Sequence, residues 1–136
     1  MKKIILVSTL LLANLIVLAQ QGKESESTSG PVLTFAEDRY EFGDIKQGDK
    51  VEHTFEFENT GNAPLVISNV LTTCGCTVPK WPREAIPPGG TGKIDVVFNS
   101  ANKSGVQNKV ITILSNAKEN RTKITLYGEV KVEDAN

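Results

Sequence analysis

Apolar and polar residues alternate with a period of two along most of the chain after residue 30. The clearest case is residues 51–59, in which one set of side chains is mostly apolar or aromatic and the other is acidic or hydroxyl-bearing. The two sets are Val51, His53, Phe55 and Phe57 against Glu52, Thr54, Glu56 and Glu58. This alternation predicts a β-strand with one buried and one solvated face. Helical spacing never persists for long enough to predict a helix.

Similar patterns predict further short strands that are separated by turn-forming residues. In chain order these are an entry strand at 32–35 and 39–42 that is broken near 37–38, and strands at 65–70, 94–98, 107–114 and 123–132. Dense turn signals, rich in asparagine, glycine and proline, lie at 59–64 and 87–90. About seven strands in about one hundred residues predict a two-layer antiparallel β-sandwich, with a barrel as the main alternative.

The N-terminal residues predict an export signal. Lys2 and Lys3 precede an almost wholly apolar run at 4–18, and Ala19 supplies a small residue at the expected cleavage point. The run is shorter than the ~20 residues that a spanning helix needs. We therefore expect cleavage after Ala19 rather than a retained anchor, and no membrane span after cleavage. Gln20 stands where a lipoprotein would carry a cysteine, so we do not expect a lipoprotein.

These predictions divide the chain into four parts. They are a signal peptide at 1–19, a flexible polar linker at 20–31, one β-sandwich domain at 32–132 and a polar tail at 133–136. Residues 20–30 offer no apolar side chain to bury, so we expect the linker to be disordered. The export signal predicts a periplasmic or extracellular destination.

The charge balance argues against a nucleic-acid partner. Removal of the signal peptide takes away Lys2 and Lys3 and leaves 13 basic against 16 acidic residues, a net charge of −3. No block of lysine and arginine remains in the sequence. Proteins that bind phosphate backbones usually carry a basic face, because each neutralised phosphate releases counterions. We expect the partner to be a protein instead.

Several unusual elements occur in a fixed order along the domain. They are Phe42-Gly43-Asp44-Ile45, Gly48-Asp49, His53-Thr54-Phe55, Asn59-Thr60-Gly61, Thr73-Cys74-Gly75-Cys76-Thr77 with Pro79 and Trp81, Pro88-Gly89 and Gly128-Glu129-Val130. In these elements the chain resembles the secreted bacterial family called domain of unknown function 1573, over residues 32–132. The resemblance implies an immunoglobulin-like sandwich, similar to hydin and major sperm protein domains, in exported or envelope proteins. It implies no established activity.

Cys74 and Cys76 are the only two cysteines of the chain, and export would bring them to an oxidising compartment. In a flat strand, residues two apart have Cα atoms about 6.6 Å apart, near the upper limit for a disulfide. We expect Gly75 to shorten this separation by adopting a positive φ in a turn or bulge. A local disulfide then stabilises only weakly, by about 1.6 kcal/mol for a three-residue loop against about 3 kcal/mol for fifteen residues.

The pair leaves four interpretations open. In the first, the two cysteines form a local bridge, or an inert reduced pair, that fixes a bend. In the second, they form a labile disulfide that takes part in thiol exchange. In the third, they bind copper(I) or zinc together with His53, and in the fourth they form a disulfide with another chain. Thiol exchange favours nearby cations, and the nearest in sequence are Lys80 and Arg83. Structural zinc usually takes four ligands, and the sequence offers three outside the carboxylates. We therefore predict no cofactor, with the two sulfurs and His53 as weak metal candidates.

Two other residues have a structural and a functional interpretation. His53 lies in register with the apolar positions of its strand, which predicts a half-buried packing residue rather than a base or ligand. Trp81 is a candidate surface contact for a partner or a sugar ring, although covering the end of the core is the simpler role. The glutamates that alternate with His53 predict a solvated face rather than a calcium site.

The sequence favours a non-enzymatic role. It contains no nucleophile with an identifiable base, no metal triad and no phosphate-binding glycine loop. Our first hypothesis is an exported module that binds another protein or scaffolds a complex through a sheet face, an edge strand or the turn near Trp81. The alternative is a small thiol-redox or soft-metal-handling protein that acts through Cys74 and Cys76.

Overall fold

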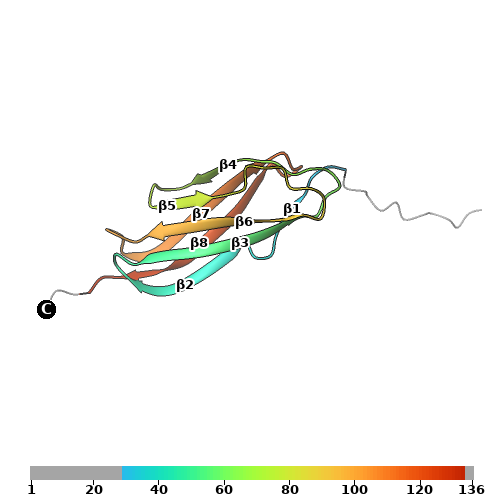
Figure 1. Cartoon of the computed structure of the whole chain (residues 1–136). Coiled ribbons are helices and arrows are strands. Elements are labelled where there is room, and N and C mark those ends of the chain that lie inside the picture. Colours follow the sequence, from blue (N-terminus) through green and yellow to red (C-terminus); the bar gives the residue numbers. More distant parts are fainter. Residues whose placement is uncertain (1–28, 134–136) are drawn as a thin grey trace, which may run out of the picture.

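The structure is a computed structural model that describes residues 29–133. The predicted signal peptide, its cleavage site and most of the predicted linker lie outside the described residues, as does all but the first residue of the predicted tail. The two ends of the described part of the chain lie at opposite ends of an elongated domain (Figure 1).

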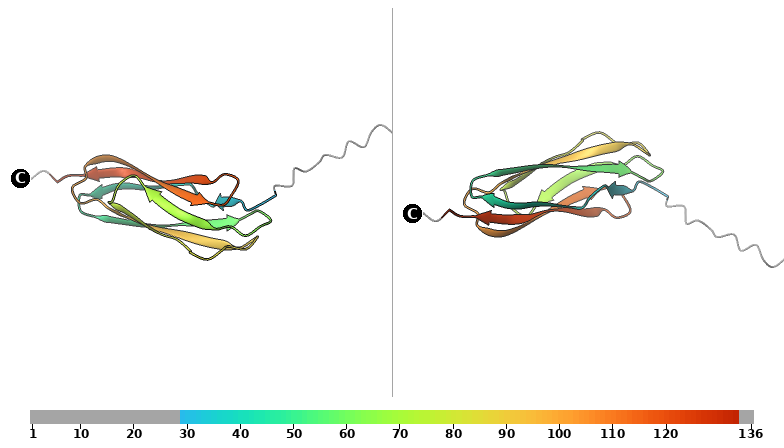
Figure 2. Two further views of the ribbon diagram at one scale, coloured as in Figure 1. Left: turned by 90° about the horizontal axis from the view of Figure 1, so that it is seen from above. Right: turned by 90° about the horizontal axis from the view of Figure 1, so that it is seen from below.

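Residues 29–133 form eight strands in two four-stranded sheets. The strands are β1 (Leu33–Phe35), β2 (Arg39–Lys46), β3 (Lys50–Asn59), β4 (Ile67–Thr72), β5 (Thr77–Lys80), β6 (Thr91–Asn99), β7 (Gly105–Ser115) and β8 (Arg121–Lys131). The first sheet has the order β1-β3-β6-β5 and the second the order β2-β8-β7-β4. The sheets pack face to face as two layers (Figure 2). This arrangement confirms the predicted all-β sandwich, and it has the strand order of an immunoglobulin-like domain.

The core lies between the sheets and is built from the inward side of each alternating strand. The first sheet contributes fully buried aromatic and branched side chains, and so does the second. These side chains are Phe55, Ile94 and Phe98 from the first sheet and Ile111, Ile113, Ile124 and Leu126 from the second. The glutamates of β3 point outward, as the alternation predicts. The hydrophobic pattern therefore determines which face of each sheet is buried.

Two features of the topology differ from the sequence prediction. β5 was not predicted, because it has only four residues and contains Pro79, which the ladder tolerates only at an edge. β2 pairs with β8 in parallel, whereas every other strand pair is antiparallel within the described residues. The parallel pair arises because the entry strand changes sheets.

The entry strand breaks where the sequence predicts. β1 pairs with β3 in the first sheet, and the Ala36 N–H continues this pairing to the Glu56 carbonyl at 3.0 Å. Two residues later the Asp38 carbonyl accepts from the Thr125 N–H at 2.8 Å, which starts the pairing of β2 with β8. The short polar segment at 36–38 thus carries the chain from one sheet to the other.

Asn59 ties the end of β3 to the surrounding loops. Its side chain is fully buried and makes four hydrogen bonds, which satisfies the two donor hydrogens and both lone-pair directions of the amide. The Oδ1 atom accepts from the N–H groups of Val32 and Gly61, and the Nδ2 atom donates to the carbonyls of Ala63 and Ile86. The asparagine of the Asn59-Thr60-Gly61 element is therefore a structural residue.

Ser100 has a similar role at the other end of the domain. Its buried hydroxyl accepts from the Gly48 N–H at 3.0 Å and lies 2.7 Å from the Asp49 carbonyl, to which it donates. Gly48 has a φ of 97°, in the left-handed region that glycine adopts without strain. The Gly48-Asp49 element is thus a turn between β2 and β3 that Ser100 holds in place.

Candidate functional site

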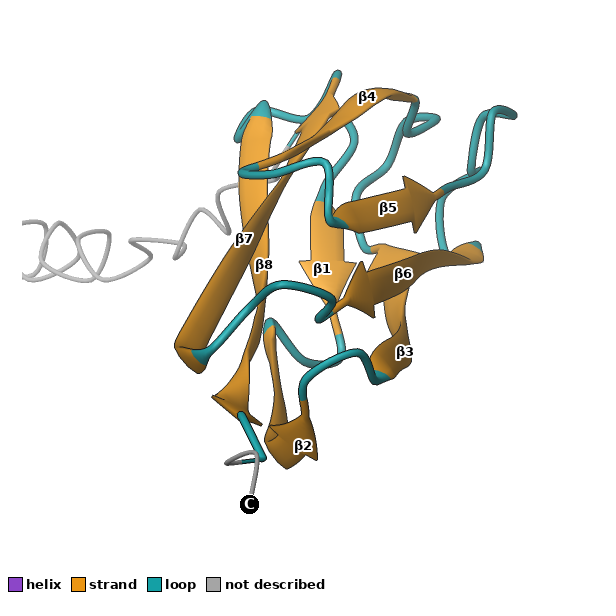
Figure 3. Cartoon of the chain, turned by 90° about the vertical axis from the view of Figure 1, so that its left-hand side faces the viewer, coloured by secondary structure: helices purple, strands orange, loops and turns teal. Residues whose placement is uncertain are grey.

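The disulfide lies where the chain passes from one sheet to the other. β4 and β5 are edge strands of different sheets, and they lie side by side at one edge of the sandwich (Figure 3). Residues 73–76 connect them, and we call residues 73–77 the disulfide corner. Cys74 and Cys76 are bridged, with their Cα atoms 5.3 Å apart. The separation is shorter than in a flat strand because the segment turns, with the Thr77 N–H bonded to the Cys74 carbonyl at 3.3 Å.

The expectation that Gly75 adopts a positive φ is wrong. The glycines with positive φ in the described part of the chain are Gly30, Gly43, Gly48, Gly89 and Gly105. A Cβ placed on Gly75 meets no atom within 4 Å, so the turn has room for a side chain there. Hydrogen bonds shape the corner instead: the Thr72 hydroxyl donates to the Cys74 carbonyl at 3.0 Å, and the Asn99 N–H donates to the Cys76 carbonyl at 2.9 Å.

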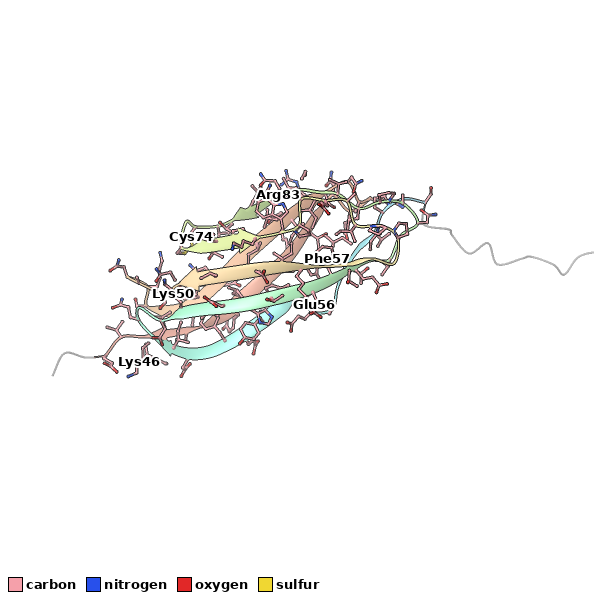
Figure 4. All side chains as sticks on the ribbon, in the orientation of Figure 1. Lys46, Lys50, Glu56, Phe57, Cys74 and Arg83 are labelled. Atoms are coloured by element: carbon pink, nitrogen blue, oxygen red, sulfur yellow. A yellow bond between two sulfur atoms is a disulfide. The ribbon has the colours of Figure 1, made fainter. Side chains whose placement is uncertain are left out.

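A buried hydroxyl lies beneath the two sulfur atoms. Thr77 is 3% exposed, and its Oγ1 atom is 3.8 Å from the Sγ of Cys74 and 3.9 Å from the Sγ of Cys76. The sulfurs are its only side-chain hydrogen-bond partners within residues 29–133. Both cysteines are half-buried, and Cys76 packs against the hydrophobic core. The corner lies at the end of the sandwich where β3 begins with Lys50 (Figure 4).

A lysine that sequence reasoning missed lies on the inner face of the opposite sheet. Lys109 is half-buried on β7, and its Nζ atom is 5.4 Å from the centre of the Phe98 ring. Phe98 is the register partner of Thr77 on β5. β4 ends at Thr72, opposite Ile111, two residues after Lys109 on β7. The ammonium group therefore lies in the same end of the sandwich as the disulfide.

The surroundings of Lys109 disfavour its charged form. Burial lowers the pKa of Lys109 below its usual value, and the positive charge of Lys103 lowers this pKa further. Lys109 makes no ion pair with any carboxylate of the described residues. Only the face of the Phe98 ring offsets part of the cost of burial. A partly buried cation without a carboxylate partner is a candidate for a role beyond packing.

We expect replacement of Lys109 by methionine to stabilise the domain at neutral pH by about 0.5 kcal/mol, because it removes a partly buried, unpaired charge that solvent still screens. In the wild type the unfolded chain binds more protons than the folded one between the lowered folded-state pKa and the usual value of 10.5. Stability of the wild type therefore rises with pH through this window. Urea unfolding at neutral pH and at the upper end of the window measures both effects. A less stable Lys109→Met variant would show that the cation supports the fold.

Trp81 packs against the hydrophobic core on one side and contacts Arg83. Its ring is half-buried against the hydrophobic core, and the Arg83 guanidinium lies 3.9 Å from the centre of the ring. The indole Nε1–H is buried and has no hydrogen-bond partner among the described residues. Arg83 is therefore held by the Trp81 ring.

His53 is also a packing residue. Its ring stacks on Tyr40 with 3.7 Å between the ring centres, and its Nε2 atom is 2.6 Å from the Oε1 atom of Glu37. β6 separates the strand of His53 from β5 and the disulfide corner. The structure therefore does not bring His53 to the sulfurs. Within residues 29–133 no three or more histidine, cysteine or acidic side chains are grouped to hold a metal ion.

The edge strands beside the disulfide corner offer little to a further strand. The Cys76 carbonyl is bonded to β6, so the alternation of the ladder turns the backbone groups of Thr77 and Pro79 outward. The Thr77 N–H is already bonded within the turn, and proline has none. On β4, the Asn69 side chain accepts from the N–H of Val70 at 2.9 Å. Such devices protect natural sheets from edge-to-edge pairing.

The outer face of the second sheet carries an apolar strip beside basic residues. We define the strip as Leu71, Val110, Thr112 and Leu114. Register places Thr112 between Leu71 and Lys123, and Leu114 beside Arg121. Leu71 is 42% exposed, and the other three are partly exposed. Neither Arg121 nor Lys123 forms an ion pair within the described residues. The face thus combines exposed apolar area with two unpaired cations.

None of the described residues belongs to a helix of the length and hydrophobicity needed to cross a bilayer. The structure is similar to that of a protein of unknown function from Porphyromonas gingivalis, with a TM-score of 0.65 and 18% identity over 76% of this chain and 48% of that one. It is also similar to a PapD-like domain of human CEP192, with a TM-score of 0.61 and 12% identity over 79% and 89% of the two chains. The YadV chaperone gives a TM-score of 0.54 and 16% identity over 76% and 54%.

The chain thus spans about half the length of the Porphyromonas protein and of the chaperone. At these identities the likeness concerns the fold alone, an immunoglobulin-like β-sandwich. No curated protein matches the sequence. A family model, by contrast, matches residues 33–130, which include every strand core and all the elements of the resemblance described above. The chain belongs to the family described as protein of unknown function (DUF1573).

Proposed function

We propose that this chain is an exported, non-enzymatic module that binds another protein of the periplasm or extracellular space. The outer face of the second sheet, with its apolar strip and unpaired cations, carries this proposal. Solvated sheet faces of antiparallel sandwiches are usually polar. An exposed apolar strip with a charged border is typical of a surface that a partner covers.

The sheet face is a better contact than the two other surfaces considered from the sequence. The edges at β4 and β5 have little free N–H to offer a partner strand, because Asn69, Pro79 and the turn at Thr77 block it. The turn near Trp81 is closed by Arg83, which lies over the indole ring. The outer face of β7 and β8, by contrast, can be covered without disturbing the backbone.

The chemistry of this face specifies the kind of partner. Arg121 and Lys123 border the strip on the β8 side, so a complementary surface places carboxylates there and apolar side chains opposite Leu71 and Leu114. The similar structures include one chaperone and one PapD-like domain, and protein binding on this fold is compatible with both. The predicted signal peptide supports the exported location.

Capture of partners from the native envelope tests this function. We expect Leu71→Asp to reduce the yield of the specific partner at least tenfold, because a carboxylate in the strip is desolvated on binding and repels an acidic partner. Val78→Asp is the matched control, since Val78 is 59% exposed on the outer face of the other sheet. Mass spectrometry of this protein, recovered as the bait, also determines whether its N-terminus is Gln20, as cleavage after Ala19 predicts.

Equal capture by the two variants, each with an intact fold, would contradict the assignment of the face. A bait that stays in the cytoplasm with Met1 in place would contradict the exported location.

A further inference from the structure

We propose that Cys74 and Cys76 form a reversible dithiol–disulfide couple that exchanges with the thiols of other molecules, and that Lys109 and Thr77 stabilise the thiolate it releases. The inference concerns the disulfide corner and is independent of the partner surface on the second sheet. It rests on the size of the bridged loop, on the access of the two sulfurs, on the Thr77 hydroxyl beside them and on the Lys109 ammonium over the neighbouring Phe98 ring.

The disulfide bond contributes little to the stability of the fold. It joins residues with a sequence separation of 2, in a connection already shaped by hydrogen bonds from Thr72, Thr77 and Asn99. Opening it therefore releases little chain entropy and leaves the corner in place. A disulfide that contributes little to folding is more easily reduced than one that closes a long loop.

The two sulfurs differ in access. Cys76 packs against the hydrophobic core, whereas Cys74 is half-buried without being part of that packing. The thiolate of an incoming thiol therefore attacks the Sγ of Cys74. The bond between the two sulfurs breaks, its electron pair goes to the Sγ of Cys76, and a mixed disulfide joins Cys74 to the incoming sulfur.

A second thiol completes the step. Its thiolate attacks the partner sulfur of the mixed disulfide, which releases Cys74 as a thiolate and yields the oxidised, disulfide-linked partner. Two thiols have then lost two electrons and two protons, and the protein disulfide has gained them as two cysteine thiols. The reverse sequence oxidises the pair at the expense of a partner disulfide, so the class of substrate is a thiol or disulfide of the exported space.

Two groups are positioned to stabilise the negative charge that forms on sulfur. The Thr77 hydroxyl is within 4 Å of both sulfurs and has no other side-chain partner among residues 29–133, so its hydrogen is free to turn toward whichever sulfur is charged. The Lys109 ammonium is unpaired and lies over Phe98, the register neighbour of Thr77. A nearby cation lowers the pKa of a thiol and favours its thiolate.

Reduction of the disulfide would also provide a negative charge to compensate the Lys109 ammonium. In the oxidised protein no anion of the described residues compensates this cation, whereas a thiolate at the corner would do so. Lys80 and Arg83, the cations nearest in sequence, do not take this role, because Lys80 lies on the exposed side of β5 and Arg83 lies over Trp81. The contact of Lys109 with Phe98, the register partner of Thr77, and not proximity in sequence, selects Lys109.

The test equilibrates the full chain with a series of reduced and oxidised glutathione mixtures at one pH, traps free thiols by alkylation and counts them by mass spectrometry. We expect reversible reduction of the wild type within the series. At a pH near the usual thiol pKa of about 8.5, we expect the equilibrium constant for reduction to fall about fivefold in Lys109→Met, which corresponds to a rise of about one unit in the pKa of a thiol, and by a smaller factor in Thr77→Val. Lys109→Arg retains the charge and should remain near the wild type.

Lys80→Gln is the matched control and should leave the equilibrium unchanged. A bridge that stays intact throughout the series overturns the proposal, and so does an equal equilibrium constant in the wild type and Lys109→Met. Accumulation of chains joined to each other through these cysteines also overturns it. Circular dichroism confirms the fold of each variant, and Lys109→Met keeps the test decisive if Thr77→Val does not fold.

Discussion

Replacement of Asn59 by aspartate is expected to destabilise the domain by about 4 kcal/mol, a large share of the 5–15 kcal/mol that holds a typical domain folded. The change replaces the Nδ2 donor with an oxygen that faces the carbonyls of Ala63 and Ile86 at hydrogen-bond distance. The buried carboxylate then faces two carbonyl oxygens, and these carbonyls lose the two N–H donors of the asparagine amide. Urea unfolding followed by circular dichroism measures the loss.

Asn62→Asp is the control for this prediction. Asn62 is exposed, and its Oδ1 atom only accepts a hydrogen bond from the Gly30 N–H, which a carboxylate also does. We expect this variant to stay within about 0.5 kcal/mol of the wild type. If Asn59→Asp were as stable as Asn62→Asp, the buried amide would not be the residue that joins these loops.

Replacement of Gly128 by alanine is expected to cost about 3 kcal/mol or to prevent folding. A Cβ at this position would lie 2.2 Å from the Cε2 atom of Phe42 and 2.6 Å from the Gly43 carbonyl oxygen. Gly128 is the register partner of Gly43 in the parallel pair of β2 with β8, so both the ring and the β2 backbone must move. Displacing core groups of this kind costs about 1–3 kcal/mol or more.

Gly75→Ala provides the comparison for this change, because a Cβ at Gly75 meets open space. Thermal unfolding of both variants separates crowding from a general effect of losing glycine. A melting temperature for Gly128→Ala equal to that of Gly75→Ala would contradict the packing of Phe42 over β8.

These two predictions explain part of the family resemblance. Asn59 and Gly61, Gly48 with Asp49, and Gly128 beneath Phe42 each serve a hydrogen-bonded turn or a close approach of a ring. The sequence shows such elements only as a fixed order of unusual residues. Their reasons depend on segments far apart in the chain, and only the folded arrangement reveals them.

The strands themselves were largely predictable. β3 has a complete alternation of buried and exposed side chains, and the structure reproduces it. β5 was missed because a four-residue strand with Pro79 carries almost no periodic signal. The parallel pairing of β2 was missed because alternation indicates which face of a strand is buried and says nothing of the neighbour it joins.

The candidate site was predictable in part. Geometry identified a feasible local bridge between Cys74 and Cys76, although the positive φ of Gly75 was a wrong mechanism for it. Lys109 was missed since it lies far from the cysteines in sequence and belongs to an inward row of β7 that already includes the polar residues Gln107 and Ser115. A charged side chain in register with the apolar Ile111 and Ile113 is the signal that would have identified it.

Site-specific photo-crosslinking in the native host tests the proposed function most directly. A photoreactive residue is placed at position 71, on the apolar strip of the second sheet, or at position 78, on the outer face of the first sheet. We predict one discrete crosslinked protein with the probe at position 71 and none with the probe at position 78. Crosslinks of equal yield from both positions, or from position 78 alone, would contradict a binding face on the second sheet.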